Sequence, residues 1–231
     1  IDGINGNSLV EYIFDNNREV KLEVLVRELI IKSIIMMNRS DNMKYTIEDI
    51  CDMSVNKLKP DKLTISDELN NLMTDVNIKG NYMMGKEALW YLRQSSHPHV
   101  LVISPPLEML GNEDWWKHHL YYSMSKFNMS LMAKTWHYEF ENIGVNTLWP
   151  RTTIDTAPVR NILGGKEMVD ISRKPDIMAE SAIGILKADP FKCSGNNYID
   201  DEVCASLDID TSQFKVNPEL SEKELMPDFF C

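Results

Sequence analysis

Apolar and polar positions are most clearly patterned in the second half of the chain, where two apolar runs flank a long amphipathic stretch. Residues 100–104 form a continuous apolar run that predicts a buried strand with a serine at its end. Residues 144–150 predict a second strand that ends at a proline. Between the two strands, residues 115–140 predict a helix with one apolar face. Five side chains of that face recur at spacings of three and four: Met124, Phe127, Leu131, Met132 and Thr135.

The flanking segments carry weaker patterns. Residues 41–71 are polar and lysine- and aspartate-rich, which favours a helix followed by a surface insertion. Ser66 and the acids that follow it predict the start of a helix that runs towards Leu92. Residues 9–14 and 33–37 predict strands, the second of them short, and residues 19–32 and 176–187 predict helices. Residues 157–174 predict a loop with a helix, and residues 194–200 predict a turn with a closing strand.

Size and composition fit one α/β domain with a single core. The chain has 231 residues, of which 43% are hydrophobic and 26% charged, as in ordinary globular proteins. No apolar run approaches the ~18 residues of a membrane span, and the first residues show no signal-peptide pattern. The net charge of −11 argues against non-specific binding to nucleic acid or to anionic membranes.

The cysteines and histidines give no sign of a metal site or a disulfide framework. Four cysteines lie far apart with no Cys-x-x-Cys pair, which is typical of a reducing, intracellular compartment. The histidines at 118, 119 and 137 lack the partners that metal binding needs, so we interpret them as surface or rim residues.

A tyrosine and a lysine in the predicted central helix carry the clearest candidate chemistry. Tyr122 and Lys126 are four residues apart, so on a helix they share one face. A phenol with a pKa near ~10 exchanges protons poorly at neutral pH. An ammonium at ~4 Å in an effective dielectric of ~20 favours the phenolate by about 4 kcal/mol, or roughly three pKa units. The pair is therefore a candidate for general acid–base catalysis on a carbonyl or an alcohol.

Taken alone, the same pair also fits a half-buried aromatic residue beside a solvated cation. Tyr121 has Ser125 four residues on and lacks such a cation. The order of a strand ending in Ser104, a helix with Tyr-x-x-x-Lys and a strand ending in Pro150 resembles the short-chain dehydrogenase/reductase family. Residues 103–107 (ISPPL) and 148–152 (LWPRT) look most like its hydroxysteroid dehydrogenase-like branch.

The resemblance implies an α/β fold with a Rossmann-like, doubly wound parallel sheet and assigns roles to four residues. Tyr122 would exchange the proton, and Lys126 would lower its pKa and hold the ribose of a nicotinamide cofactor. Ser104 would bind the substrate oxygen. Asn77, within a Val-Asn-x-x-Gly match, would anchor a water of the proton relay. As a lone mid-helix asparagine it would otherwise be read as an exposed residue.

The resemblance also implies a set of cofactor-binding positions, for NADP or NAD. Asp15 would lie near the adenine ring and Asn38 in an Asn-Asn-Ala-Gly-like motif, although both also fit plain strand-end caps. After the second strand, Pro150, Ile154 and Thr156 would hold the nicotinamide end, together with Tyr122 and Lys126. The chain departs from the family where Arg39 and Arg151 replace small residues.

The resemblance leaves no counterpart in this sequence for the family's glycine-rich phosphate loop and first two strands. The glycines of residues 1–8 do not follow a strand, so we interpret them as a turn. Because the first residue is Ile1, the chain is expected to be a processed product or a fragment whose phosphate loop lies upstream. The alternative is a catalytically dead copy of the enzyme that acts, if at all, as an interaction protein.

The resulting prediction is a single domain over 1–231, without the sterol-carrier domain that this branch often appends. The chain would transfer a hydride between NAD(P) and a carbonyl or alcohol of a lipid-like small molecule, without nucleic-acid partners. In the family the helix at 115–140 builds a subunit interface, which implies a homo-oligomer, although core packing explains its apolar face equally well. Location in the peroxisome or the mitochondrion is implied by the resemblance alone.

Overall fold

The computed structural model describes residues 71, 73–111 and 119–231 of the chain. These residues belong to one compact unit. Residues 1–70, 72 and 112–118 lie outside the described residues, and so do the predictions made for them. The single domain over the whole chain accordingly stays a prediction.

Three parallel strands form the described sheet, in the order β1-β2-β3. β1 spans His99–Ile103, β2 Gly144–Trp149 and β3 Asn197–Ile199. In their register, His99 pairs with Gly144 and Thr147 pairs with Asn197. The predicted strands at 100–104, 144–150 and 194–200 are therefore confirmed to within a few residues. All six residues of β2 are buried, as expected for the middle strand of a parallel sheet.

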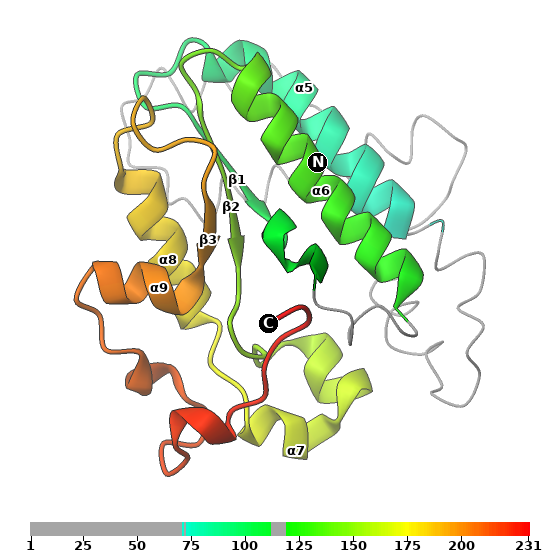
Figure 1. Cartoon of the computed structure of the whole chain (residues 1–231), viewed down its shortest axis with the longest axis vertical. Coiled ribbons are helices and arrows are strands. Elements are labelled where there is room, and N and C mark those ends of the chain that lie inside the picture. The colour runs from blue at the N-terminus through cyan, green and yellow to red at the C-terminus, as the bar shows by residue number, and fades with distance from the viewer. Residues whose placement is uncertain (1–70, 72, 112–118) are drawn as a thin grey trace, which may run out of the picture. The chain divides into compact units, whose positions relative to one another are not determined.

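Helices cover both faces of this sheet (Figure 1). α5 (Asn81–Leu92) and α6 (Leu120–Glu139) lie side by side along one face, and α8 (Asp176–Lys187) and α9 (Asp200–Ser206) lie on the other. Shorter helical segments complete the described part: η1 (Thr74–Gly80), η2 (Leu107–Gly111), η4 (Val159–Leu163), α7 (Gly165–Asp170), η5 (Thr211–Phe214) and η6 (Glu222–Glu224). None of the helices in the described residues is long and apolar enough to cross a membrane.

The core follows from the alternation of side chains along the strands. Val102 and Val145 join the cluster formed with α6, which includes Trp136. Leu148 instead joins Ile185 of α8 in a second cluster on the opposite face. A sheet that packs helices on both faces confirms the predicted α/β, Rossmann-like architecture.

The apolar face predicted for the central helix does not form one buried stripe. Phe127 is buried, whereas Met124 and Leu131 are 49% and 53% exposed. The buried face of α6 is built largely from small and aromatic side chains at other positions: Ser123, Ser125, Phe127, Met129, Ser130, Ala133 and Trp136. Small serines let the helix lie close to the sheet, so several of its larger apolar side chains point outward.

Candidate active site

The candidate site forms at the carboxyl end of β1, where the chain packs against α6. Ser104 follows the last residue of β1 and is fully buried. Its hydroxyl oxygen has no hydrogen-bond partner among the described residues. A buried hydroxyl without a partner is unfavourable, and such atoms often mark a place where a ligand supplies the missing bond.

Both neighbours of Ser104 accept hydrogen bonds from α6. The Lys126 ammonium donates to the carbonyl of Ile103 at 3.3 Å, and the Ser130 hydroxyl donates to the carbonyl of Pro105 at 2.6 Å. Lys126 also lies 5.4 Å above the ring of Trp149 in β2. These contacts fix the end of β1 against one turn of α6, so the structure brings Lys126 and Ser104 into the same small region.

Tyr122 lies one helical turn before Lys126 and is partly buried among aromatic rings. Its ring centroid is 5.3 Å from that of Phe229 and 6.3 Å from that of Phe230, which it faces almost in parallel. Tyr121, by contrast, is 44% exposed. Of the two adjacent tyrosines, Tyr122 is the one enclosed with Lys126.

Asn77 is tied to the same turn of α6 through a serine. Its side-chain amide donates to the Ser125 hydroxyl at 3.0 Å, and that hydroxyl donates to the carbonyl of Tyr122 at 2.9 Å. The carbonyl of Asn77 accepts a hydrogen bond of 2.8 Å from the Asn81 side chain. Asn77 lies in the π-helical segment η1, and π-helical turns are frequent at functional sites.

Burial sets the charge states at this site, and one prediction from the sequence is wrong here. We expected Lys126 to lower the pKa of Tyr122. The pKa of Tyr122 is instead raised, first by burial and then by the nearby negative charge of Asp228. Burial also lowers the pKa of Lys126 to about 8, with Asp228 acting in the opposite direction. At neutral pH Tyr122 is therefore a neutral phenol, which suits a proton donor.

Analysis of the sequence missed the residues that close the site. Asp228 is partly buried, and burial, together with Asp200, raises its pKa to about 7. Phe229 contacts both Tyr122 and His119, with ring centroids 5.3 and 4.9 Å apart. His119 was expected at the surface or rim, and it forms part of this aromatic cluster. An acid beside two phenylalanines was a visible signal, but nothing in the sequence placed it near Tyr122.

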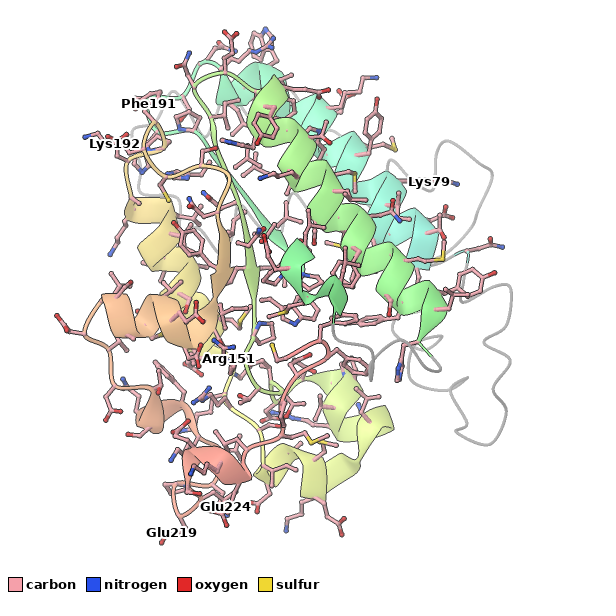
Figure 2. The ribbon with its side chains drawn as sticks, in the orientation of Figure 1. Lys79, Arg151, Phe191, Lys192, Glu219 and Glu224 are labelled. Carbon is pink, nitrogen blue, oxygen red and sulfur yellow. The ribbon has the colours of Figure 1, made fainter. Side chains whose placement is uncertain are left out.

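The segment after β2 is held by a different set of contacts. Arg151, which replaces a small residue of the family pattern, pairs with Asp201 and Glu202 of α9 (Figure 2). The side chain of Ile154 is buried in a core cluster, so only its backbone could serve a cofactor. Thr156 is exposed, and its carbonyl accepts the backbone N–H of Arg160 at 2.9 Å.

Pro150 lies buried at the end of β2, and its carbonyl accepts a hydrogen bond from the Cys231 thiol at 3.3 Å. The structure thus brings Ser104, Tyr122, Lys126 and Asn77 together around the first half of α6. The other two proposed cofactor residues, Asp15 and Asn38, lie outside the described residues.

The described residues fit the nicotinamide end of a dinucleotide. An ammonium has three donors, and Lys126 uses one of them within the described part of the chain, in a bond of 3.3 Å. Its other donors suit ribose hydroxyls. The unpartnered Ser104 hydroxyl suits the oxygen of a carbonyl or alcohol. Ligands of open α/β folds bind beyond the carboxyl ends of the strands, which is where these groups lie.

Comparison with known proteins agrees with this geometry. No protein-family model matches the chain. Hydroxysteroid dehydrogenase-like protein 2 from Xenopus laevis is 39% identical over 163 residues, or 69% of this chain and 37% of that protein. The human protein of the same name is 37% identical over 161 residues, with the same two coverages. The chain thus spans a little over a third of the length of these curated relatives.

Solved structures give the same result for the fold. A putative dehydrogenase from Xanthomonas campestris matches 74% of this chain and 61% of its own, with 33% identity and a TM-score of 0.66. A short-chain dehydrogenase from Mycobacterium thermoresistibile matches 76% and 60%, with 30% identity and a TM-score of 0.62. By sequence and by fold, the chain is similar to members of the short-chain dehydrogenase/reductase family.

Proposed function

We propose that the chain is an oxidoreductase that transfers a hydride between NAD or NADP and a carbonyl or alcohol carbon. The observation that carries this proposal is the placement of Ser104. Its buried hydroxyl lacks a partner among the described residues, and the residue before it accepts a hydrogen bond from Lys126. This arrangement leaves one hydroxyl, one ammonium and one phenol available to a ligand at the end of β1.

Each side chain then has a distinct task. Ser104 donates a hydrogen bond to the substrate oxygen and stabilises the negative charge that develops there. Tyr122 donates its phenolic proton to that oxygen during reduction and takes it back during oxidation. Lys126 holds the ribose hydroxyls of the cofactor. Asn77, fixed through Ser125, supports the water through which Tyr122 is reprotonated.

The cofactor supplies the hydride, and the protein supplies position and electrostatics. Pro150 and the backbone of Ile154 and Thr156 would border the nicotinamide, and Asp15 and Asn38 would serve the adenosine end. We propose a lipid-like substrate because aromatic rings surround Tyr122 and because the relatives carry the name hydroxysteroid dehydrogenase-like. Location in the peroxisome or mitochondrion stays a prediction from the resemblance.

Fluorescence titration with NADH and NADPH tests the proposal on the chain itself. We expect saturable binding of at least one reduced cofactor and its oxidation in the presence of a carbonyl substrate. Ser104→Ala is expected to lower turnover by about 10²-fold, as removal of an oxyanion donor does in other enzymes, while cofactor binding persists. Absence of saturable binding to either cofactor would contradict the proposal and favour a catalytically dead relative.

We also propose that the chain forms a homo-oligomer through α5 and α6. The outward side chains of these helices include Trp90, 65% exposed, and Tyr138, 72% exposed, together with Tyr82, Met124 and Leu131. Packing within the described residues does not cover these side chains. A second copy of the same helix pair would bury them in a two-fold symmetric interface.

A further inference from the structure

The segment Leu225–Cys231 is built onto the chain that leaves β2. The N–H of Thr153 donates to the carbonyl of Met226 at 2.8 Å, and the N–H of Asp228 donates to the carbonyl of Arg151 at 3.1 Å. These two bonds pair the segment antiparallel with residues 151–153. The second bond places the backbone of Asp228 opposite Arg151, the residue that follows the buried Pro150.

Aromatic contacts lock the segment on the other side. The Trp149 indole N–H donates to the carbonyl of Phe229 at 2.9 Å. Phe230 is 2% exposed and packs against Phe127 and Trp149, with ring centroids 4.9 and 6.1 Å apart. The Lys126 ammonium lies over the ring of the same Trp149. The two residues that follow Asp228 therefore contact Tyr122, and they also contact Trp149, over which Lys126 lies.

Few charged groups of the described residues lie near the Asp228 carboxyl. One of its oxygens accepts the N–H of Phe229 at 2.6 Å. Within the described residues, the titratable and charged groups on the elements packed around the segment are Tyr122 and Lys126 of α6, His119 at the start of α6, Asp200 of α9, Arg151 after β2, and Cys231. Arg151 is already paired with Asp201 and Glu202. Of these described groups, Lys126 is the cation that acts on the Asp228 carboxyl.

We propose that Asp228 is a positioning residue of the active site, whose carboxylate keeps Lys126 charged and Tyr122 in its phenol form. This inference rests on the proposed function. Burial alone would drive Lys126 towards the neutral amine, which would bind ribose hydroxyls less well. A nearby carboxylate opposes that loss of charge, and the same carboxylate disfavours a phenolate at Tyr122. The segment thereby favours the state of the site that can donate a proton to a carbonyl.

The pKa values at the site agree in sign with this role. Asp228 raises the pKa of both Lys126 and Tyr122, whereas burial lowers the first and raises the second. The pKa of Asp228 itself is about 7, so its support is expected to fade below neutral pH.

NMR titration of the chain without cofactor tests this coupling directly. With ¹³C-labelled lysine, we expect Asp228→Asn to lower the titration midpoint of Lys126 by about 0.5–1 pH unit. Asp228→Glu should restore it. Glu219→Gln, which removes an exposed acid, should leave the midpoint unchanged. An unchanged Lys126 midpoint in Asp228→Asn would overturn the proposal.

The unaltered chain provides a second test that does not depend on a variant of Asp228. Its Lys126 signal, assigned with Lys126→Arg, should show an additional inflection near pH 7, where Asp228 titrates. A Lys126 curve without that inflection would also overturn the proposal.

Turnover measurements separate this inference from the proposed function. In an active enzyme, Asp228→Asn should move the alkaline limb of the pH profile for carbonyl reduction to lower pH by the same 0.5–1 unit, roughly. A chain without oxidoreductase activity would overturn the proposed function and the catalytic meaning of Asp228 together. Normal activity with uncoupled titrations would overturn the role of Asp228 alone.

Discussion

At the scale of single residues, two buried serines on the same contact between β1 and α6 differ in one respect. The Ser104 hydroxyl has no partner among the described residues, whereas the Ser130 hydroxyl donates to the carbonyl of Pro105 at 2.6 Å. An unpaired buried hydroxyl lowers stability by roughly 1–3 kcal/mol, and a satisfied one contributes about 1 kcal/mol. In the proposed function, Ser104 lowers the stability of the free protein and supplies a hydrogen bond to the ligand.

We expect Ser104→Ala to raise the free energy of unfolding by about 1 kcal/mol and Ser130→Ala to lower it by a similar amount. Urea denaturation of both variants and of the parent chain measures this difference. If Ser104→Ala were as destabilising as Ser130→Ala, the Ser104 hydroxyl would have a partner in the folded protein, and the argument for a vacant ligand position would fail.

The raised pKa of Asp228 makes a second prediction at this scale. Burial raises that pKa from its ordinary value near ~4 to about 7, so the folded chain binds the proton more tightly than the unfolded chain does. The stabilisation is complete below pH ~4 and is lost as the pH rises through 7. Relative to Asp228→Asn, the chain should lose stability between pH ~4 and ~7, by at most about 1.4 kcal/mol per pH unit.

Urea unfolding at several pH values gives the difference between the chain and Asp228→Asn. Glu219→Gln serves as the control, since its exposed carboxyl should add no such slope. A difference that stays constant from pH 4 to 7 would show that Asp228 is not buried as described.

At the scale of elements, the close approach of α5 and α6 depends on a glycine. A Cβ atom on Gly85 of α5 would lie 2.4 Å from the ring of Trp136, which is buried in α6. On α8, a Cβ on Gly184 would also lie 2.4 Å from its nearest neighbour, but that neighbour is the flexible end of the exposed Leu207. The two helical glycines therefore form a matched pair.

We expect Gly85→Ala to lower the free energy of unfolding by about 1–3 kcal/mol, because the indole ring cannot move without disturbing the core. Gly184→Ala should be neutral or stabilising by up to about 1 kcal/mol, because alanine favours a helix and Leu207 can move aside. Thermal or urea unfolding compares the two. Equal effects would contradict the described packing of α5 on α6.

The elements also show how far the sequence alone could lead. Apolar runs at 100–104 and 144–150 predicted β1 and β2 because buried parallel strands need such runs, and Asp176–Lys187 formed the predicted helix. The sequence pattern does not predict α9, because its first turn is a run of acids with no apolar periodicity, and it places Asp200 in the closing strand at 194–200. Local patterns fixed these elements, but the face each one buries depended on its neighbours.

The same limit applies to the site. The spacing of Tyr122 and Lys126 is local, so the sequence could predict that they share a helix face. The contact of Tyr122 with Phe229 spans more than 100 positions, and the sequence gives no local sign of it. Because burial, followed by Asp228, raises the pKa of Tyr122, the prediction from Lys126 alone had the wrong sign.

At the scale of the whole molecule, the outward side of α5 and α6 carries the proposed subunit interface. If two copies pair through these helices, light scattering coupled to size-exclusion chromatography should give a mass of at least twice 26.7 kDa. Leu131→Lys combined with Tyr138→Lys should shift the chain to a monomer, since burying two unpaired charges is unfavourable.

Phe191→Lys provides the matched control, because Phe191 is an exposed aromatic residue outside α5 and α6 (Figure 2). That variant should keep the mass of the parent chain. A monomer in the absence of any substitution would contradict the proposed interface.

The central claim is that Tyr122 is the proton donor of an NAD(P)-dependent reaction, and a comparison of two adjacent tyrosines tests it most directly. Tyr121 is exposed, and Tyr122 is enclosed with Lys126. Substitution by phenylalanine removes only the hydroxyl at either position and leaves the backbone unchanged. The measurement is the rate of carbonyl reduction at saturating cofactor. Tyr122→Phe should lose about 10²–10⁴-fold in that rate with cofactor affinity unchanged, and Tyr121→Phe should lose none. Equal rates for the parent chain and Tyr122→Phe would contradict the account.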